Sequence, residues 1–298
     1  MSEYLKYLDP KTLTKITRLD LLARLVVEGY VSGLHRSPYH GFSVEFAEHR
    51  EYVPGDDIRH VDWRVFARSD RYYIKQYEEE TNLRCTMLLD VSESMKYGSG
   101  EVSKKDYGCY LAASLAYLLL QQQDSVGLAT FDNELRRFIP CKSTSGHLRV
   151  LLEEMGKAGT ERKTRMDRVF HDVAERIDRR GMVVVISDLF DDPERVMMGL
   201  RHLRHNKHEV IVFHIMDEYE LTFPFDDMTL FEGLEETGEV TTEPRSLRDT
   251  YLEEVAKFVS TMKKGCRQHG IDYVQISTDQ HLDVALSAYL AARSSKGR

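Results

Sequence analysis

The chain has 298 residues, enough for one large domain or two moderate ones with a substantial buried core. Hydrophobic residues make up 42% and charged residues 30% of it, a composition typical of a soluble globular protein. The formal net charge of −8 argues against a dedicated nucleic-acid-binding protein, because such proteins usually carry a basic surface. We therefore expect no nucleic-acid partner.

The apolar runs and the cysteines indicate the location of the protein in the cell. The first residues, MSEYLKYLDP, lack the basic start and the long apolar run of a signal peptide, and no apolar stretch is long enough to cross a bilayer. The four cysteines are far apart and form no CxxC pair, which indicates reduced thiols. We expect a cytoplasmic protein that is not inserted in a membrane.

Residues 1–81 differ in composition and pattern from the rest of the chain and are predicted to form a separate region. Apolar residues recur at helical spacing over residues 10–30. A stretch rich in glycine, aromatic and charged residues follows, and the alternating pattern around Ile74 predicts a strand. We expect an N-terminal helix followed by a small β-containing appendage.

Residues 82–298 alternate between predicted strands and predicted helices. The predicted strands are 83–90, 125–131, 135–141 (antiparallel), 182–187, 209–215 and 271–277. The predicted helices are 104–123, 145–156, 165–180, 191–205, 246–269 and one that begins at Leu282. Such alternation predicts an α/β fold with a doubly wound, mostly parallel sheet and helices on both faces. Residues 217–245 interrupt the alternation and are predicted to form a hairpin or an irregular insert.

The segment MLLDVSESM carries the most informative polar residues of the chain. Asp90 ends an apolar strand, and Ser92 and Ser94 follow at alternate positions, so three oxygen side chains can converge on one point of a tight loop. A cluster of hard oxygen ligands without histidine or cysteine suits Mg²⁺ or Mn²⁺ and suits zinc poorly. The alternative is that Ser92 or Ser94 caps the helix that follows.

Two other predicted strand ends carry polar residues of the same kind. In the segment AGTERKTRMDRVF, Thr160 and Thr164 lie just before a helix, and Asp188 directly follows the apolar strand 182–187. In a doubly wound sheet, adjacent central strands would bring Asp90 and Asp188 to the same edge. A loop threonine between them would complete an octahedral oxygen site, with water in the remaining positions.

This pattern resembles the metal-ion-dependent adhesion site of the von Willebrand factor A domain. That family carries Asp-x-Ser-x-Ser, then a loop threonine, then an aspartate that ends a later strand. The resemblance implies that Mg²⁺, or alternatively Mn²⁺, is bound by Asp90, Ser92, Ser94, Thr164 and Asp188. Thr164 has the spacing to the next helix that resembles the family and is preferred, whereas Thr160 has the usual preceding glycine, so both threonines remain candidates.

A second resemblance covers roughly residues 35–215. The segment YVPGDDIRHVDWRVFAR, followed by a strand and DVSESM, is similar to the signature of the DUF58 family of bacterial proteins. In that family the domain is often linked to MoxR-type AAA+ ATPases. The resemblance therefore implies an adaptor or chaperone-like role beside such an ATPase, and it implies no molecular activity.

The predicted ligand set suggests how the site would work. Neutral serine and threonine oxygens leave a bound cation more electrophilic than several carboxylates would, so one coordination position stays attractive to an Asp or Glu of another protein. We expect a non-enzymatic, cation-dependent protein-binding module without catalytic residues. One alternative is a metal-dependent phosphohydrolase with Asp90 as nucleophile. Haloacid-dehalogenase-type sites, however, need a second acid where Ser92 stands, and no suitably placed lysine is evident. The other alternative is a scaffold that holds the metal only structurally.

Two more groups of residues are interpreted as structural. The residues Arg59, Asp62, Trp63 and Arg64 could form a docking surface, but an Asp–Arg network beneath a packed tryptophan is favoured, since buried charges need partners. The residues His202, His205 and His208 lie around a predicted helix end beside arginine and lysine, and they are predicted to be solvated rather than metal-binding.

Overall fold

The computed structural model describes residues 44–53, 61–79, 83–144, 146–157, 166–233 and 238–286. The chain divides into two compact units, of which the smaller spans Glu28–Asn82 and the larger contains Leu83–Arg298. The predicted helix over residues 10–30 and the candidate ligands Thr160 and Thr164 lie outside the described residues.

A pair of strands and one short helix form the described part of the smaller unit. β1 (Val44–Glu51) pairs antiparallel with β2 (Tyr73–Glu79), and α3 (Trp63–Ser69) lies between them in the chain. The alternation around Ile74 therefore marks a strand, as the sequence predicts.

One residue of the predicted group around α3 has a clear structural role. Asp62 caps the helix, because its carboxylate accepts hydrogen bonds from the backbone N–H groups of Arg64 and Val65 at 2.9 and 3.3 Å. Trp63 is 60% exposed, so the interpretation of a packed tryptophan over an Asp–Arg network is wrong in that respect. Arg59 lies outside the described residues.

Six strands form one mixed sheet in the larger unit. They are β3 (Arg84–Asp90), β4 (Ser125–Phe131), β5 (Leu135–Lys142), β6 (Met182–Ser187), β7 (Glu209–Met216) and β10 (Asp272–Ser277). Their order across the sheet is β10-β7-β6-β3-β4-β5. β5 runs antiparallel to β4 and the other neighbouring pairs are parallel, which confirms the predicted α/β fold with a mostly parallel sheet.

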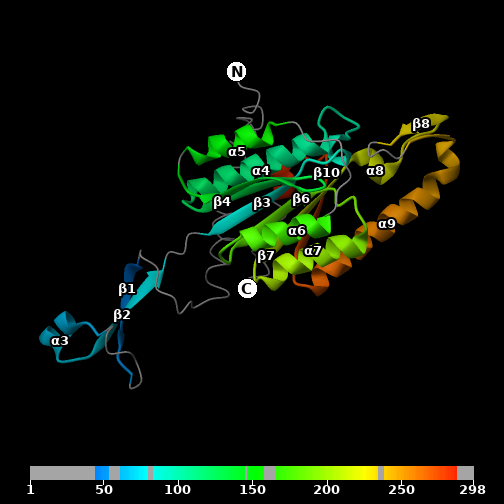
Figure 1. Cartoon of the computed structure of the whole chain (residues 1–298). Helices are drawn as coiled ribbons and strands as arrows, with labels where there is room; N and C mark the ends of the chain where they lie inside the picture. Colours follow the sequence, from blue (N-terminus) through cyan, green and yellow to red (C-terminus); the bar gives the residue numbers. More distant parts are fainter. Residues whose placement is uncertain are drawn as a thin grey trace. The chain divides into compact units, whose positions relative to one another are not determined.

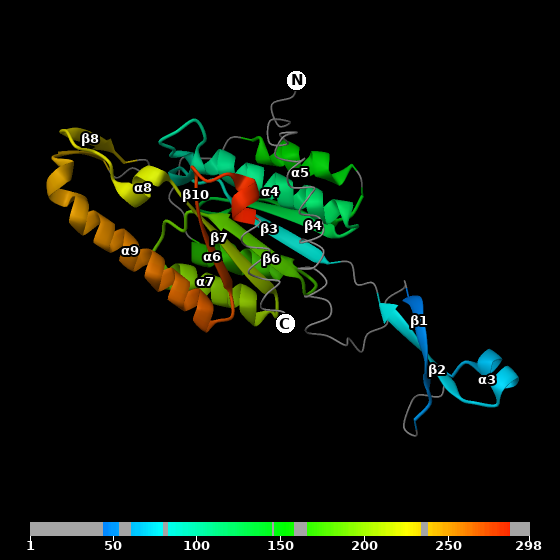
Figure 2. The ribbon, with the colours of Figure 1, turned by 180° about the vertical axis from the view of Figure 1, so that it is seen from behind.

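Helices cover both faces of this sheet (Figure 1; Figure 2 shows the reverse view). On one face lie α4 (Lys104–Gln121) and α5 (His147–Met155), and on the other lie α6 (Met166–Arg176), α7 (Pro193–His205) and α9 (Pro244–Gln268). No helix in the described part of the chain is both long enough and apolar enough to cross a membrane.

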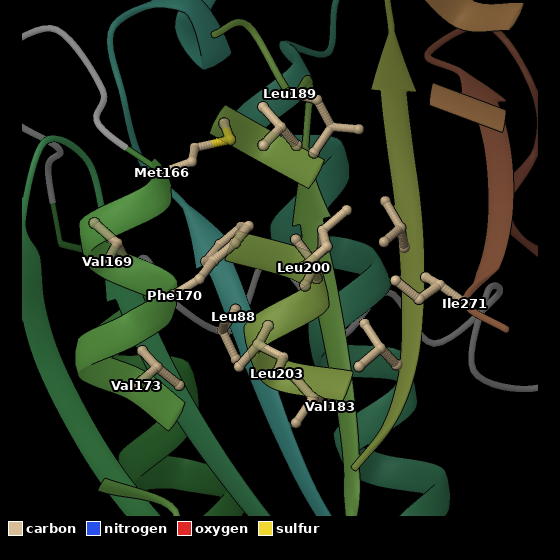
Figure 3. Close-up of a cluster of buried hydrophobic side chains, with 14 of the residues drawn as sticks. Leu88, Met166, Val169, Phe170, Val173, Val183, Leu189, Leu200, Leu203 and Ile271 are labelled. Carbon is tan, nitrogen blue, oxygen red and sulfur yellow. The ribbon is translucent and has the colours of Figure 1, made fainter. Parts of the chain in front are cut away.

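A large cluster of buried apolar side chains joins the sheet to α6 and α7 (Figure 3). Phe170 of α6 and Leu200 of α7 belong to it, together with Val183 of β6, a strand that is buried throughout its length. A Cβ atom on Gly199 of α7 would lie 2.7 Å from Cδ2 of Phe170, so the glycine permits the two helices to approach closely. This packing fixes the ends of β3 and β6, where the polar residues lie.

The predicted insert at residues 217–245 contains a short helix and a hairpin. These elements are α8 (Glu218–Thr222), β8 (Thr229–Glu232) and β9 (Glu239–Thr242), and the two strands pair antiparallel. The ring of Phe223 lies 4.5 Å from that of Tyr251 in α9 and 5.7 Å from that of Phe231 in β8. Aromatic packing therefore seats the insert on α9.

Candidate metal site

The candidate site lies at the centre of the sheet, where the strand order reverses. If the six strands are numbered in chain order, their spatial order reads 3-2-1-4-5-6, so the reversal falls between β3 and β6. Asp90 is the last residue of β3, and Asp188 directly follows β6. Open α/β sheets bind ligands in the crevice outside the carboxyl ends of the strands at such a point.

Four of the predicted ligands lie together at this switch point, and we refer to this group of side chains as the crevice. The backbone N–H of Ser92 donates to Oδ1 of Asp90 at 2.9 Å, and the hydroxyl oxygens of Ser92 and Ser94 are 3.1 Å apart. The hydroxyl of Ser94 also bonds the carboxylate of Asp188. All four side chains are buried. The structure thus brings residues from two distant strand ends into one cluster of oxygens.

The alternative role of the two serines as helix caps is wrong for the long helix that follows. The cap of α4 is Ser103, whose Oγ accepts a hydrogen bond from the N–H of Asp106 at 3.1 Å. Ser94 instead begins a short 3₁₀ turn, Ser94–Lys96, whose N-cap residue Glu93 makes no side-chain capping bond. The hydroxyls of Ser92 and Ser94 are therefore directed to the crevice and not to the start of α4.

The threonine that would complete the site is not among the described residues. The described chain resumes at Met166, whose backbone N–H donates to Oδ2 of Asp191 at 3.1 Å. Asp191 belongs to the loop that begins with Asp188. Met166 therefore lies beside this loop, and the choice between Thr160 and Thr164 stays a prediction.

A buried lysine also occupies the crevice, and no pattern in the sequence indicated it. Lys104 begins α4 and is 2% exposed. Its Nζ donates to Oδ2 of Asp188 at 2.8 Å and to Oε1 of Glu220 in α8 at 2.6 Å. No such lysine is evident from the sequence, and the structure places Lys104 in contact with Asp188.

The residues that follow β6 form a tightly held turn around the crevice. The hydroxyl of Ser187 donates to Oδ2 of Asp90 at 2.6 Å and accepts from the N–H of Leu189 at 2.8 Å. The N–H of Phe190 donates to Oδ1 of Asp188 at 3.2 Å. Ser187 thus joins the two strand ends, although a serine at the end of an apolar strand does not by itself suggest such a role.

The two aspartates have opposite electrostatic environments. Burial and the neighbouring charge of Asp188 raise the pKa of Asp90 to about 7. Burial also acts to raise the pKa of Asp188, but the ammonium of Lys104 and the hydrogen bonds from Ser94 and Phe190 hold it below its usual value. Burial likewise disfavours the ammonium of Lys104, yet Asp188 and Glu220 raise its pKa above the ordinary value. The ammonium of Lys104 therefore lies between the carboxylates of Asp188 and Glu220, while the carboxyl group of Asp90 accepts from Ser187.

The oxygen donors of this set suit a small, hard divalent cation, but the ammonium of Lys104 already bonds Oδ2 of Asp188. Two carboxylates and two hydroxyls supply oxygen alone, and the carboxylate of Asp90 is buried beside a second carboxylate. Within the described ranges, no group of three or more histidine, cysteine, aspartate or glutamate side chains could hold a metal ion. A cation at this point would therefore need the serine hydroxyls in addition to the two carboxylates.

The three histidines near the end of α7 do not share one environment. His202 is half-buried, with Nε2 at 3.1 Å from Nδ1 of His171 in α6, and His205 is exposed. His208 is only 2% exposed, so the prediction of a solvated side chain is wrong for this residue. Its position immediately before the buried strand β7 is the physical reason.

The chain is similar to several known proteins. A family model described as "Protein of unknown function DUF58" matches residues 48–260. An uncharacterized protein of Mycobacterium tuberculosis (strain H37Rv) is 26% identical over 296 residues, which covers 96% of this chain and 90% of that protein.

Two solved structures that resemble the chain have low sequence identity to it. The conserved hypothetical protein BatB from Bacteroides thetaiotaomicron has a TM-score of 0.47 and 16% identity, and the match covers 72% of this chain and 100% of that chain. The VWA domain of SpRpn10 has a TM-score of 0.39 and 13% identity, over 70% of this chain and 95% of that chain.

Proposed function

Because the chain belongs to the DUF58 family of proteins of unknown function, we propose a function for it from the geometry of its crevice. The protein is a non-enzymatic module of the cytoplasm that binds other proteins in a manner that depends on a divalent cation. Its partner offers an Asp or Glu side chain, and a MoxR-type AAA+ ATPase is the candidate partner, for which this chain would act as an adaptor or chaperone-like protein.

One observation carries the proposal, namely that oxygen side chains from two separate strand ends meet at the switch point of the sheet. Asp90, Ser92 and Ser94 come from the end of β3, and Asp188 comes from the end of β6. These four residues, with Thr164 or Thr160, would hold Mg²⁺ or Mn²⁺. The cation would supply a Lewis-acidic position for a carboxylate oxygen of the partner.

The chain's own residues prepare this site before any partner arrives. Ser92 and Ser187 orient the carboxylate of Asp90 through hydrogen bonds of 2.9 and 2.6 Å. The serine hydroxyls are neutral donors of oxygen, so they add no negative charge that would repel an incoming carboxylate. Lys104 balances the charge of Asp188 and so reduces that repulsion further.

A capture experiment tests this function. The tagged protein is incubated with a lysate of its source and with the purified MoxR-type ATPase, in Mg²⁺ and in EDTA, and bound protein is measured. We expect capture in Mg²⁺ only, with a loss of at least about tenfold in Asp90→Asn, since one charged ligand is removed.

The matched control for this experiment is Asp124→Asn. Asp124 is also a buried carboxylate beside a strand end, but it lies before β4, at the opposite edge of the sheet. This control should capture the partner as well as wild type does. Equal capture in EDTA and Mg²⁺, or equal capture by Asp90→Asn and wild type, would contradict the proposal.

The phosphohydrolase alternative gains one supporting observation from Lys104, a buried lysine beside a carboxylate at the same sheet edge. Against it, Ser92 still stands where a second acid is needed. Hydrolysis of a generic phosphate monoester with Mg²⁺ by wild type, lost in Asp90→Asn, would favour this alternative. The absence of turnover would leave the binding module as the better account.

A further inference from the structure

Lys104 is a cation that the fold itself supplies to the crevice. Its side chain is 2% exposed, and its ammonium donates to Asp188 at 2.8 Å and to Glu220 at 2.6 Å. The backbone N–H of Lys104 also donates to the carbonyl of Tyr97 at 2.9 Å, which fixes the loop between the serines and α4. The ammonium is therefore held in place and is not free to move away into solvent.

The position of Glu220 is equally well defined. Its Oε1 accepts from Lys104, and its Oε2 accepts from the N–H of Asp217 at 2.8 Å in the capping box of α8. Glu220 therefore shares the ammonium with Asp188 from the side of the insert.

The charges predict opposite effects of these two residues on any divalent cation in the crevice. The carboxylates of Asp188 and Glu220 outweigh the single positive charge of Lys104, and the carboxyl group of Asp90 lies beside Asp188. A divalent cation would be attracted by this excess of negative charge. The ammonium of Lys104 would repel that cation and would share Asp188 with it, because both are attracted to the same carboxylate.

We propose that Lys104 is a built-in competitor for the divalent cation that sets the cation affinity of the site, and that Glu220 limits this competition by sharing the ammonium. The inference rests on the proposed function, because it concerns the same site. It assigns a role to the insert, since α8 brings Glu220 to the crevice.

The two substitutions that test this inference have opposite expected signs. Lys104→Met removes the competing charge, so the affinity for Mn²⁺ should rise by about tenfold or more. Glu220→Gln leaves the ammonium to Asp188 alone, so the affinity should fall by about three- to tenfold. Glutamine can keep the capping bond to the N–H of Asp217, and the helix start should therefore be preserved.

Each variant has a control with the same change of charge. Lys105→Met alters the neighbouring lysine, whose Nζ contacts the carbonyl of Lys157 at the surface, and Glu218→Gln alters an exposed residue in the same turn of α8. Lys104→Arg keeps the positive charge and should remain close to wild type. Isothermal titration with Mn²⁺ gives the affinities, and circular dichroism checks that each variant is folded.

The outcomes separate this inference from the proposed function. The inference is supported if Lys104→Met binds Mn²⁺ more tightly and Glu220→Gln binds it more weakly, each relative to its control. If the two residues have a purely structural role, both variants should bind Mn²⁺ more weakly. If wild type binds Mn²⁺ but Lys104→Met matches Lys105→Met, the inference alone is wrong. If Lys104→Met does not fold, the Glu220→Gln variant provides the test. An affinity of Glu220→Gln for Mn²⁺ equal to that of Glu218→Gln then overturns the inference. If no folded variant binds Mn²⁺, the proposed function and the inference both fail.

Discussion

Asp90 and Asp188 are the same kind of side chain held in two different electrostatic states. Asp188 bonds an ammonium, whereas Asp90 bonds the hydroxyl of Ser187 and the N–H of Ser92, which carry no charge. The pKa of Asp188 is accordingly lowered, and burial with the nearby negative charge raises the pKa of Asp90 to about 7. Asp90 is thus the carboxylate that has the most to gain from an added cation.

The residues after Asp188 present an aromatic side chain beside the crevice. Leu189 is completely buried and has a φ of 54°, a left-handed conformation that costs a non-glycine residue about 1–2 kcal/mol. The hydrogen bond from its N–H to Ser187 and its apolar packing hold this turn. Phe190 follows and is 65% exposed, so a strained turn keeps an apolar ring in solvent near the site.

We expect Phe190→Ser to weaken capture of the protein partner by about tenfold, since the burial of an exposed aromatic ring can contribute more than 1 kcal/mol to an interface. The affinity for Mn²⁺ should stay within about twofold of wild type, because a backbone N–H and not the ring contacts Asp188. Capture assays and Mn²⁺ titration on the same samples measure both quantities.

Val150→Ser is the matched control for this residue. Val150 is 47% exposed on α5, and its substitution removes a comparable exposed apolar group. Unchanged capture by Phe190→Ser, or the same loss in Val150→Ser, would show that Phe190 has no place in the interface.

Asp217 joins several elements at the edge of the sheet that carries the site. It follows β7, is fully buried, and accepts hydrogen bonds from the N–H of Ser99 at 3.0 Å and from Oγ1 of Thr278 at 2.8 Å. It also caps α8 through the N–H of Tyr219. One carboxylate therefore ties the loop that follows the serines to the end of β10 and to the insert, which explains how the insert can reach the crevice.

The opposite edge of the sheet contains a carboxylate that costs stability at neutral pH. Asp124 accepts from the N–H of Leu83 at 2.8 Å and so joins the starts of β3 and β4, but its Oδ2 has no hydrogen-bond partner among the described residues. Burial raises its pKa from 3.8 to about 6. The unfolded chain therefore loses this proton at lower pH than the folded chain does, and the stability of the fold falls as pH rises from about 4 to about 6.

We expect Asp124→Asn to be more stable than wild type at pH 7.5 by about 1–2 kcal/mol, a value reduced for partial solvent screening. Below about pH 4 the difference should disappear, because wild type is then protonated in both states. Urea unfolding in EDTA at pH 4 and 7.5 gives the difference between the two proteins. A difference that is the same at both pH values would show that the charge of Asp124 is not its cause.

The sequence predicts the strands, the helices and the mostly parallel sheet well, but it predicts the polar contacts only in part. The end of an apolar strand marks Asp90 and Asp188, and a parallel sheet necessarily brings such ends to one edge. Lys104 could not be found in this way, because a lysine in the first turn of a helix is normally solvated. It is buried by contact with Glu220, which lies 116 residues further along the chain in an insert without regular periodicity.

Removal of the cation provides the test that belongs to the whole molecule. A cation that binds only the folded state stabilises it by mass action, by about 2.7 kcal/mol when its concentration is 100 times the dissociation constant. For a chain of this size we expect the melting temperature in Mg²⁺ to exceed that in EDTA by roughly 5–10 °C.

In Asp90→Asn this shift should largely vanish, because the most cation-dependent carboxylate is gone, whereas Asp124→Asn should keep it. Thermal melting and partner capture, measured on the same samples, then distinguish two kinds of site. A purely structural cation would raise the melting temperature and leave capture indifferent to chelation. A bridging cation must raise the melting temperature and must also make capture depend on the cation. The reason is that the same Asp90 that holds the cation in the crevice is needed to present it to the carboxylate of the partner.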